Sequence, residues 1–396
     1  MSDVAAEAGA ESSRPAPGRR ERTATRIAFF IGGFAGASWA PLVPYAKQRL
    51  QLDDGALGLV ILTFGLGSLS TMALAGWAAG RFGCRKVLRI ASILACLALP
   101  PLAFVGWIPA LAAALFLFGS AIGSIDVVVN IQAVIVEKAS ERPLMSGFHA
   151  GWSIGGFAGS ALVTGLISLD VVPWATVLVS VGIILGLHFG FSGGLLPYGS
   201  HSTEKQRMMF PRGLVIGLGV LCFIAFLSEG SVLDWGAVFL SSNKNVDIAL
   251  SGWGYTAFSL VMVICRLTGD AVVHRLGGFR ILLIGGLLAA AGFAVVIFAP
   301  PLWLMLIGFG IIGLGLSNVV PVLFSLAGKQ TVMPAHQAVS VVSTIAYSGI
   351  LLGPAMIGGV ARLSSLAYGL GLVSLMTLGI AASASLAKRA RGAGAK

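Results

Sequence analysis

The sequence predicts an all-α membrane protein with twelve transmembrane helices in two pseudo-symmetric six-helix bundles. Three observations lead to this fold class: an apolar composition, twelve apolar runs of membrane-spanning length, and an internal repeat. Of the 396 residues, 57% are hydrophobic and 10% are charged, and the mean hydropathy is +0.93. An ordinary soluble domain carries about 25% charged residues, so this composition excludes a soluble protein.

Each apolar run is long enough to cross a hydrocarbon core about 30 Å thick as a helix. The runs are continuously apolar rather than apolar at every second residue, which disfavours a transmembrane β-barrel. The predicted spans are 25–46, 57–79, 87–107, 110–136, 146–168, 173–192, 213–240, 250–270, 281–299, 302–326, 338–360 and 366–387.

Polar segments divide the chain into domains. Residues 1–23 are polar and basic, so we expect a disordered cytoplasmic tail and no cleaved signal peptide. Residues 24–192 should form the first six-helix bundle and residues 213–387 the second. Between them, 193–212 is predicted to be a cytoplasmic linker, and 388–396 a basic cytoplasmic tail.

The net charge of +11 reports topology rather than a nucleic-acid partner. The 26 Lys and Arg residues alternate by loop, gathering before span one, after spans two, four, eight and ten, between the bundles and at the C-terminus. By the positive-inside rule both termini are cytoplasmic. The loops on the opposite side hold only Lys47, Arg49, Lys244 and Arg362.

Sliding the chain against itself by 194 residues reveals the repeat, which implies two halves related about an axis along the membrane normal. The match drifts in span four, where Asp126 best meets Asn318. Elsewhere it superimposes Asp53 on Asp247, Gly58 on Gly252, Gly83 on Gly277, Gly155 on Gly349 and Gly159 on Gly353.

A motif between spans two and three is similar to a family signature. The segment Gly76-Trp-Ala-Ala-Gly80-Arg81-Phe-Gly83-Cys-Arg85-Lys86 resembles the cytoplasmic signature of the major facilitator superfamily, Gly-x3-Asp-Arg-x-Gly-x-Arg-Arg, with Gly80 where the family usually has Asp. A degenerate copy runs from Asp270 to Arg280. The resemblance covers the chain apart from its tails and implies a transporter with the fold of that superfamily.

Three further motifs resemble the YbjJ-type bacterial inner-membrane subfamily, which is loosely grouped with sugar permeases such as the fucose permease. That resemblance implies a multi-pass protein of the bacterial inner membrane, and the substrate does not follow from it. We expect the chain to be a monomer. The motifs are Asp126-x3-Asn130, Arg142-Pro143-Leu144-Met145-x2-Phe148-His149 and Glu229-Gly230-x3-Asp234-Trp235.

Acidic residues in mid-span are the first candidates for a solute or proton site. Asp126, one turn from Asn130, and Glu229 each fall near the middle of a span, where a charge costs about 2.5 to 3.5 kcal/mol. An acid disfavoured as an anion can exchange a proton, as a proton-coupled carrier requires. The alternative is a buried acid bonded to a neighbouring helix.

Asp234 follows Glu229 by five residues, which turns the two side chains apart on a regular helix. We therefore expect both to face one cavity only if the helix breaks at Gly230; otherwise Asp234 is a helix cap or an interhelical bond. The remaining candidate contacts, which could equally be packing or loop-capping groups, are His149, Trp152, Asn318, Ser343 and Tyr347.

Basic residues at the cytoplasmic ends of the spans are candidates for a gate. Arg81, Arg85 and Lys86 could close that side by reaching helix C-termini and acids of the other half, or could be simple topology charges. Arg266 and Asp270 have i, i+4 spacing and could pair across one turn. With Gly83 of the motif, the predicted gate is Arg81, Gly83, Arg85, Lys86, Arg266 and Asp270.

We therefore expect a proton-coupled secondary transporter of a sugar, polyol or similar metabolite that works by alternating access. An exporter of a drug or biosynthetic product is the alternative, although Ser160 stands where proton-driven drug antiporters carry Pro. A membrane sensor is less expected, because no soluble signalling domain is present. No nucleotide loop, catalytic cluster, paired cysteines or metal-ligand spacing occurs, so we expect neither an enzyme nor a cofactor.

Overall fold

The computed structural model describes residues 18–140, 144–199, 213–330 and 333–385. Within these ranges every regular element is helical, and twelve segments are long and apolar enough to cross a membrane. The twelve predicted spans and the all-α fold class are confirmed, with ends that shift by six residues or fewer, except that span nine begins ten residues earlier than predicted, at Ala271.

Spans one to six come from the first half of the chain. Span one has three pieces, because Pro41 and Pro44 interrupt its helix near the end. The elements are α2 (Arg19–Ala37), η1 (Ala40–Leu42), α3 (Val43–Arg49), α4 (Asp54–Phe82), α5 (Cys84–Phe104), α6 (Ile108–Lys138), α7 (Met145–Ser168), α8 (Pro173–Phe191) and η2 (Ser192–Gly194).

Spans seven to twelve come from the second half. Spans eight and ten are each broken into two helices, which the hydropathy pattern does not reveal. The elements are α9 (Gly213–Val238), η3 (Phe239–Asn243), α10 (Ile248–Ser251), α11 (Trp253–Leu267), α12 (Gly269–Phe298), α13 (Leu302–Leu316), α14 (Val319–Lys329), α15 (Ala335–Leu363), α16 (Leu366–Ala382) and η4 (Ser383–Ser385).

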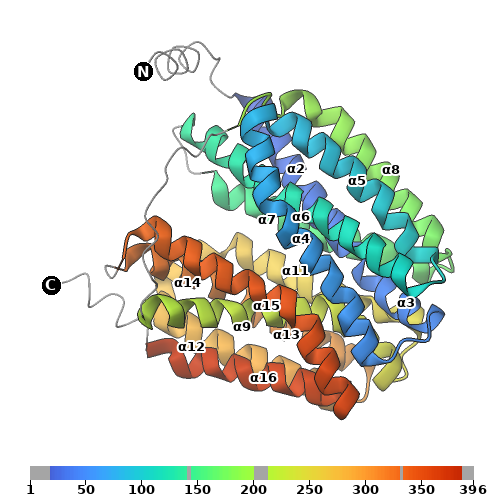
Figure 1. Ribbon diagram of the computed structural model, residues 1–396. Helices are drawn as coiled ribbons and strands as arrows, with labels where there is room; N and C mark the ends of the chain where they lie inside the picture. The colour runs from blue at the N-terminus through green and yellow to red at the C-terminus, as the bar shows by residue number, and fades with distance from the viewer. Residues whose placement is uncertain (1–17, 141–143, 200–212, 331–332, 386–396) are drawn as a thin grey trace, which may run out of the picture.

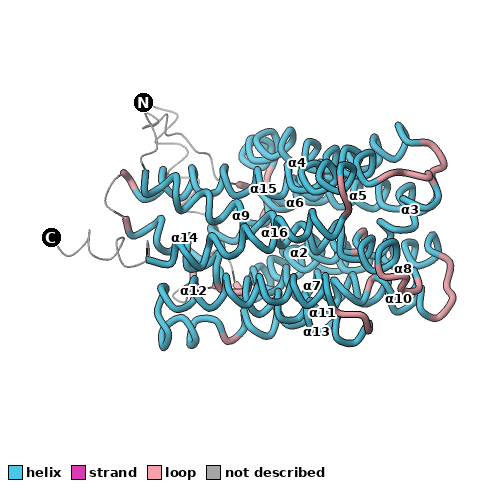
Figure 2. Tube along the Cα trace, turned by 90° about the horizontal axis from the view of Figure 1, so that it is seen from below, coloured by secondary structure: helices cyan, strands magenta, loops and turns pink. Residues whose placement is uncertain are grey.

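The helices gather into two groups of six spans, blue to green and yellow-green to red in Figure 1. Within the groups the broadest contacts are α4 with α6, α2 with α7, α9 with α15 and α12 with α13; between the groups, α4 packs on α15 and α7 on α11. Figure 2 shows the helices running side by side, with the loops at the two ends. We call the end at which α2 begins and η4 finishes the terminal end, and the other the far end.

The two groups meet at the far end and diverge toward the terminal end (Figure 1). Ser160 and Thr256 share a hydrogen bond of 2.9 Å between their hydroxyl oxygens. Nearer the far end, Ser168 donates to the Ala249 carbonyl at 3.1 Å and accepts from the Trp253 indole at 3.2 Å. The far end is therefore closed in this conformation.

Glycines allow the close approach of the two groups. A Cβ at Gly58 on α4 would collide with the Pro354 carbonyl of α15, and a Cβ at Gly252 would collide with Thr164 and Pro41. Gly58 and Gly252 are partners under the 194-residue repeat. The two seams between the groups, α4 with α15 and α7 with α11, therefore use equivalent positions in each half.

The repeat also fixes the turn after span two, between α4 and α5, and the equivalent kink inside α12. Gly83 and Gly277 are the glycines with positive φ among the described residues, at 86° and 73°, a conformation that side chains with a Cβ disfavour. Asp53 and Asp247 each cap the helix that follows, by accepting hydrogen bonds from Ala56 and Ala249.

Two basic residues of the far end, which differ by one residue from the register of the repeat, reach equivalent carbonyls. Arg49 donates to the carbonyls of Ala103 and Val105 at 2.8 and 2.9 Å. Lys244 donates to the equivalent carbonyls of Ile297 and Ala299 at 2.6 and 3.2 Å. Both satisfy carbonyls left open at the end of a helix, which explains basic residues on the side that is otherwise poor in them.

The predicted tails need one correction. Residues 19–23 were expected to be disordered but form the first turn of α2, where the Glu21 carboxylate accepts a hydrogen bond of 2.7 Å from the Gly18 backbone. Residues 193–199 of the predicted linker pack against the first group, with Leu195 and Leu196 buried. Residues 1–17, 200–212 and 386–396 lie outside the described part of the chain.

Candidate functional site

A cavity of about 240 Å³ lies between the two groups. Its wall comes from α2, α4, α6 and α7 of the first group and from α9, α11 and α15 of the second. The lining includes the aromatic residues Trp39, Phe64, Trp152, Tyr255, Phe258 and Tyr347, and the charged residues Asp126, Glu229, Asp234 and Arg266.

Asp126 links the two groups across this cavity. Its carboxylate accepts a hydrogen bond of 2.7 Å from the Tyr347 hydroxyl on α15. One turn along α6, the Asn130 amide donates to the Asp126 carboxylate at 3.2 Å and to its backbone carbonyl at 2.8 Å. The structure thus brings together Asp126, Asn130 and Tyr347, three residues singled out in the sequence.

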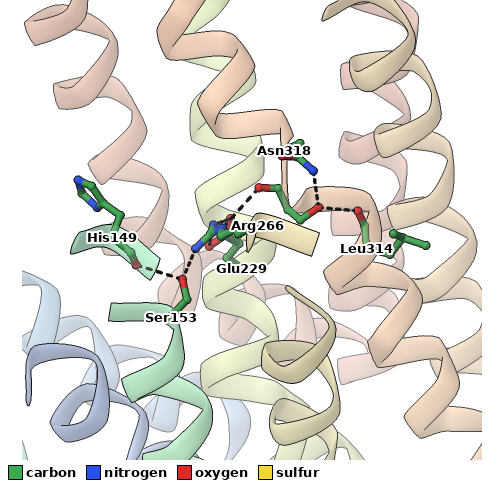
Figure 3. Close-up of polar contacts among 7 residues, drawn as sticks. His149, Ser153, Glu229, Arg266, Leu314 and Asn318 are labelled. Carbon is green, nitrogen blue, oxygen red and sulfur yellow. Dashed lines mark hydrogen bonds and ion pairs between the residues drawn. The ribbon is translucent and has the colours of Figure 1, made fainter. Parts of the chain in front are cut away.

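Arg266 forms a second link between the groups (Figure 3). Its guanidinium donates to Glu229 on α9 at 3.2 Å and to the Ser153 hydroxyl on α7 at 3.0 Å. It also points a third N–H at the Ser317 carbonyl, 3.4 Å away, in the break between α13 and α14. One cation therefore joins an acid of its own half to a hydroxyl of the other.

The expected one-turn pairing of Arg266 with Asp270 stays a prediction, because the side chain of Asp270 lies outside the described residues. Between the two residues, α11 ends at Leu267 and α12 begins at Gly269. Arg266 lines the cavity, and a cation in an apolar run could have indicated this, since Glu229 is also intramembrane.

The expectation that Glu229 and Asp234 face one cavity only if the helix breaks at Gly230 is wrong, because α9 is continuous from Gly213 to Val238. Glu229 and Asp234 nevertheless both line the cavity. Five residues rotate a side chain by about 140° net on an α-helix, so α9 presents a wide sector of its surface, including Gly230 and Leu233, to the cavity. Residues on more than one face of α9 therefore line the cavity.

Of the other candidates, Trp152 lines the cavity and His149 does not. The Trp152 ring occupies the space beside Gly32 on α2, where a Cβ would clash with it. His149 is exposed at the start of α7, with its ring centroid 5.1 Å from that of Phe29. Figure 3 shows its imidazole turned away from Ser153 and Arg266.

Asn318 is one residue removed from the site. Its amide donates to the Ser317 hydroxyl at 3.1 Å, next to the carbonyl that Arg266 reaches. Sequence reasoning missed Ser153 and Ser317, because a serine in a membrane helix carries no signal that separates a ligand from ordinary interhelical bonding.

The predicted gate residues make their described contacts within the first group. Arg85 donates to the carbonyls of Leu195 and Gly193 at 2.7 and 2.9 Å, so it fastens the start of the linker to the α4–α5 turn. Arg81 and Lys86 lie 5.8 and 5.1 Å from the centroid of the Phe82 ring. In this conformation the terminal ends of the groups are apart, and the expected contacts across them are not among those described.

Comparisons with known proteins agree with this architecture. A family model described as Major Facilitator Superfamily matches residues 26–354. An uncharacterized MFS-type transporter of Yersinia pestis is 45% identical over 373 residues, which cover 94% of this chain and 97% of the relative. An uncharacterized transporter of Sinorhizobium fredii is 32% identical over 368 residues, which cover 91% and 96%.

Among solved structures, a mutant of the nucleoside transporter NupG aligns with a TM-score of 0.73. The alignment covers 94% of this chain and 99% of that one, at 15% sequence identity. An identity this low supports a common fold and carries no information on the solute.

Proposed function

This chain belongs to the Major Facilitator Superfamily and is a secondary transporter in a lipid bilayer, and on that premise we propose that it moves a small polar solute across the bacterial inner membrane in exchange for, or together with, protons. Alternating access is the working mode: the two groups of spans rock about the cavity between them. The solute class is a sugar, polyol or similar metabolite.

The main support for this proposal is that two acids, Asp126 and Glu229, make contacts whose strength depends on the charge of the carboxylate. Asp126 accepts from Tyr347 of the other group, and Glu229 holds the guanidinium that reaches Ser153. Protonation of Asp126 weakens the first link, since a neutral carboxyl is a poorer acceptor. Protonation of Glu229 removes the counter-charge of Arg266.

Both events change the free energy of contacts between the groups, so proton binding and rocking are linked. A bound proton shifts a conformational equilibrium only if it interacts differently with the two conformations. Contacts that join the groups in this conformation meet that condition, because they lengthen or re-form when the groups rotate.

The cavity suits a small polar solute. Its volume is about 240 Å³. Aromatic walls with a few convergent polar groups are typical of small-molecule sites. With the termini in the cytoplasm, as the distribution of Lys and Arg predicts, the closed far end makes this conformation inward-facing.

The test is transport in proteoliposomes that hold the purified full-length chain. A panel of radiolabelled sugars and polyols is screened for uptake driven by an imposed proton gradient. Asp126→Asn and Glu229→Gln should each lose accumulation, because the titrating group is gone. Counterflow without a gradient should survive in the variant that has lost only proton coupling.

The matched control is Asp170→Asn, which changes an exposed acid at φ 61°, a conformation that Asn adopts as readily as Asp. It should transport like the wild type. Wild-type accumulation by both cavity variants would refute proton coupling through these acids.

Export of a drug or biosynthetic product is the second candidate, favoured by the six aromatic residues of the cavity wall. The same vesicles decide between the two candidates. An exporter accumulates solute only when the proton gradient has the opposite sense.

A further inference from the structure

We propose that Asp234 is the docking group for an ammonium on the solute, so that the substrate class is small hydroxylated amines rather than neutral or acidic solutes. This inference rests on the transport function proposed above and narrows its substrate.

The charges that line the cavity are unbalanced. Three carboxylates, Asp126, Glu229 and Asp234, face the single guanidinium of Arg266. Asp126 is satisfied by Tyr347 and Asn130, and Glu229 is paired with Arg266. Asp234 is the acid left over.

The Asp234 side chain is unpartnered as well as buried. Only 6% of the residue is exposed, and no hydrogen bond or ion pair reaches its carboxylate from the described part of the chain. It lies on the cavity wall. A buried carboxylate without a partner is destabilised as an anion, and a cation that enters the cavity supplies the missing charge and donors together.

Aromatic rings stand on the same side of the cavity. Tyr255 and Phe258 of α11 both line it, with ring centroids 5.8 Å apart, and Tyr255 is close enough to Asp234 to interact with it electrostatically. Aromatic faces attract ammonium groups. A carboxylate beside aromatic rings is therefore selective for a cation over a neutral group.

The position of Asp234 gives the bound ammonium a role in closure. Along α9, Asp234 lies between Glu229 and the far end, and the neighbouring α11 residues bond to α7 through Thr256 and Ser160. The amine thus sits at the deep end, and the hydroxyl groups of the solute face Asp126, Glu229 and Arg266. Anionic solutes are disfavoured, because Arg266 is already committed to Glu229.

The experiment compares matched probes on the purified full-length protein. Glucosamine, glucose and N-acetylglucosamine share a ring and differ in one substituent, which is charged only in glucosamine; ethanolamine and ethylene glycol form a smaller pair. Binding is followed as the rise in the thermal unfolding midpoint, measured by circular dichroism, for the wild type, Asp234→Asn and the control Asp170→Asn.

We expect each amine to bind roughly tenfold to a hundredfold more tightly than its neutral counterpart, the range for one charge-assisted contact. The preference should vanish in Asp234→Asn and persist in Asp170→Asn. Equal stabilisation by amines and neutral probes, or none by any amine, overturns the proposal.

Two results separate this inference from the transport function. If neutral sugars bind and are transported, and Asp234→Asn changes neither, the transporter stands and the amine site does not. If Asp234→Asn abolishes proton-driven accumulation while amines and neutral probes bind alike, the occupant of Asp234 is a proton, and the inference fails.

Discussion

Arg266 is the side chain on which the polar contacts of the cavity converge. It is 28% exposed, and its partner Glu229 is 20% exposed, so water screens the pair only in part. It contacts α7, α9 and the break in span ten. A cation with partners on three elements holds those elements together. Any event that removes the negative charge of Glu229 therefore loosens all three contacts of Arg266.

Replacing one member of this pair should therefore cost more than replacing both. Glu229→Gln or Arg266→Gln alone should lower the free energy of unfolding by about 2 kcal/mol, between the values for exposed and buried pairs. The double variant should recover most of the loss, because two amides can bond to each other. Chemical unfolding in detergent, followed by circular dichroism, measures the cycle.

The exposed substitution Asp170→Asn serves as the reference for the effect of a charge change alone. Losses that simply add in the double variant would contradict an energetic coupling between Glu229 and Arg266.

Sequence reasoning found the acids of the site and missed how they are paired. Asp126 and Glu229 stand out because a charge in an apolar run is expensive and visible locally. Their partners are distant in sequence: Tyr347 is 221 residues from Asp126, and Arg266 is 37 from Glu229. They come together through the tertiary packing, in which α4 lies against both α6 and α15, and α9 lies against α11. The transport roles of these residues remain predictions.

The turn after span two, at Gly83, and the kink in α12, at Gly277, are the elements most dependent on a single residue type. At Gly83 the positive φ coincides with a close approach of the Pro197 carbonyl, and Arg85 fastens the segment from Gly193 to Leu195 beside it. The turn and the start of the linker therefore form one unit.

Gly83→Ala should destabilise this unit by about 1 to 3 kcal/mol from the backbone conformation alone, because φ 86° with ψ 151° is a region open essentially to glycine, and further because the Pro197 carbonyl must move. The matched control is Gly182→Ala on α8, where a Cβ meets open space and helix propensity favours Ala. Hydrogen exchange of residues 193–199 should rise in Gly83→Ala and stay unchanged in Gly182→Ala. Unchanged exchange in both variants would show that the turn tolerates a side chain.

The spans could be predicted because length and apolarity are local properties of the chain, whereas the hydropathy pattern does not show where they break. Span ten breaks at Ser317 and Asn318, where the carbonyl of Ser317 becomes available to Arg266. Pro321 has no N–H to bond that carbonyl four residues before it, so this break has a local cause in the sequence. The 194-residue repeat loses its register in the same span, and its counterpart α6 is continuous.

The molecule as a whole is held in one conformation by seams at the far end. Ser160 and Thr256 bond across one of them, and Gly58 and Gly252 allow the helices to touch. If transport requires this end to open, every cycle must separate α7 from α11 and α4 from α15.

A reversible bond across the seam should arrest that cycle. Oxidation of the double variant Ser160→Cys/Thr256→Cys should abolish counterflow in proteoliposomes, and a reductant should restore it. Each single variant under the same oxidant is the control for nonspecific damage and should keep its activity. Full transport by the cross-linked protein would mean that this seam stays closed throughout the cycle.

The positions of the tryptophans allow the filling of the cavity to be followed by intrinsic fluorescence. Trp39 and Trp152 line the cavity, so their emission depends on what fills it. Four others are exposed on the outer surface, where bilayer lipids lie against them and brominated acyl chains can quench their light. In such lipids the emission that remains comes mainly from the interior, and solute entry becomes visible without a label. The four outward-facing indoles are Trp77, Trp107, Trp174 and Trp303.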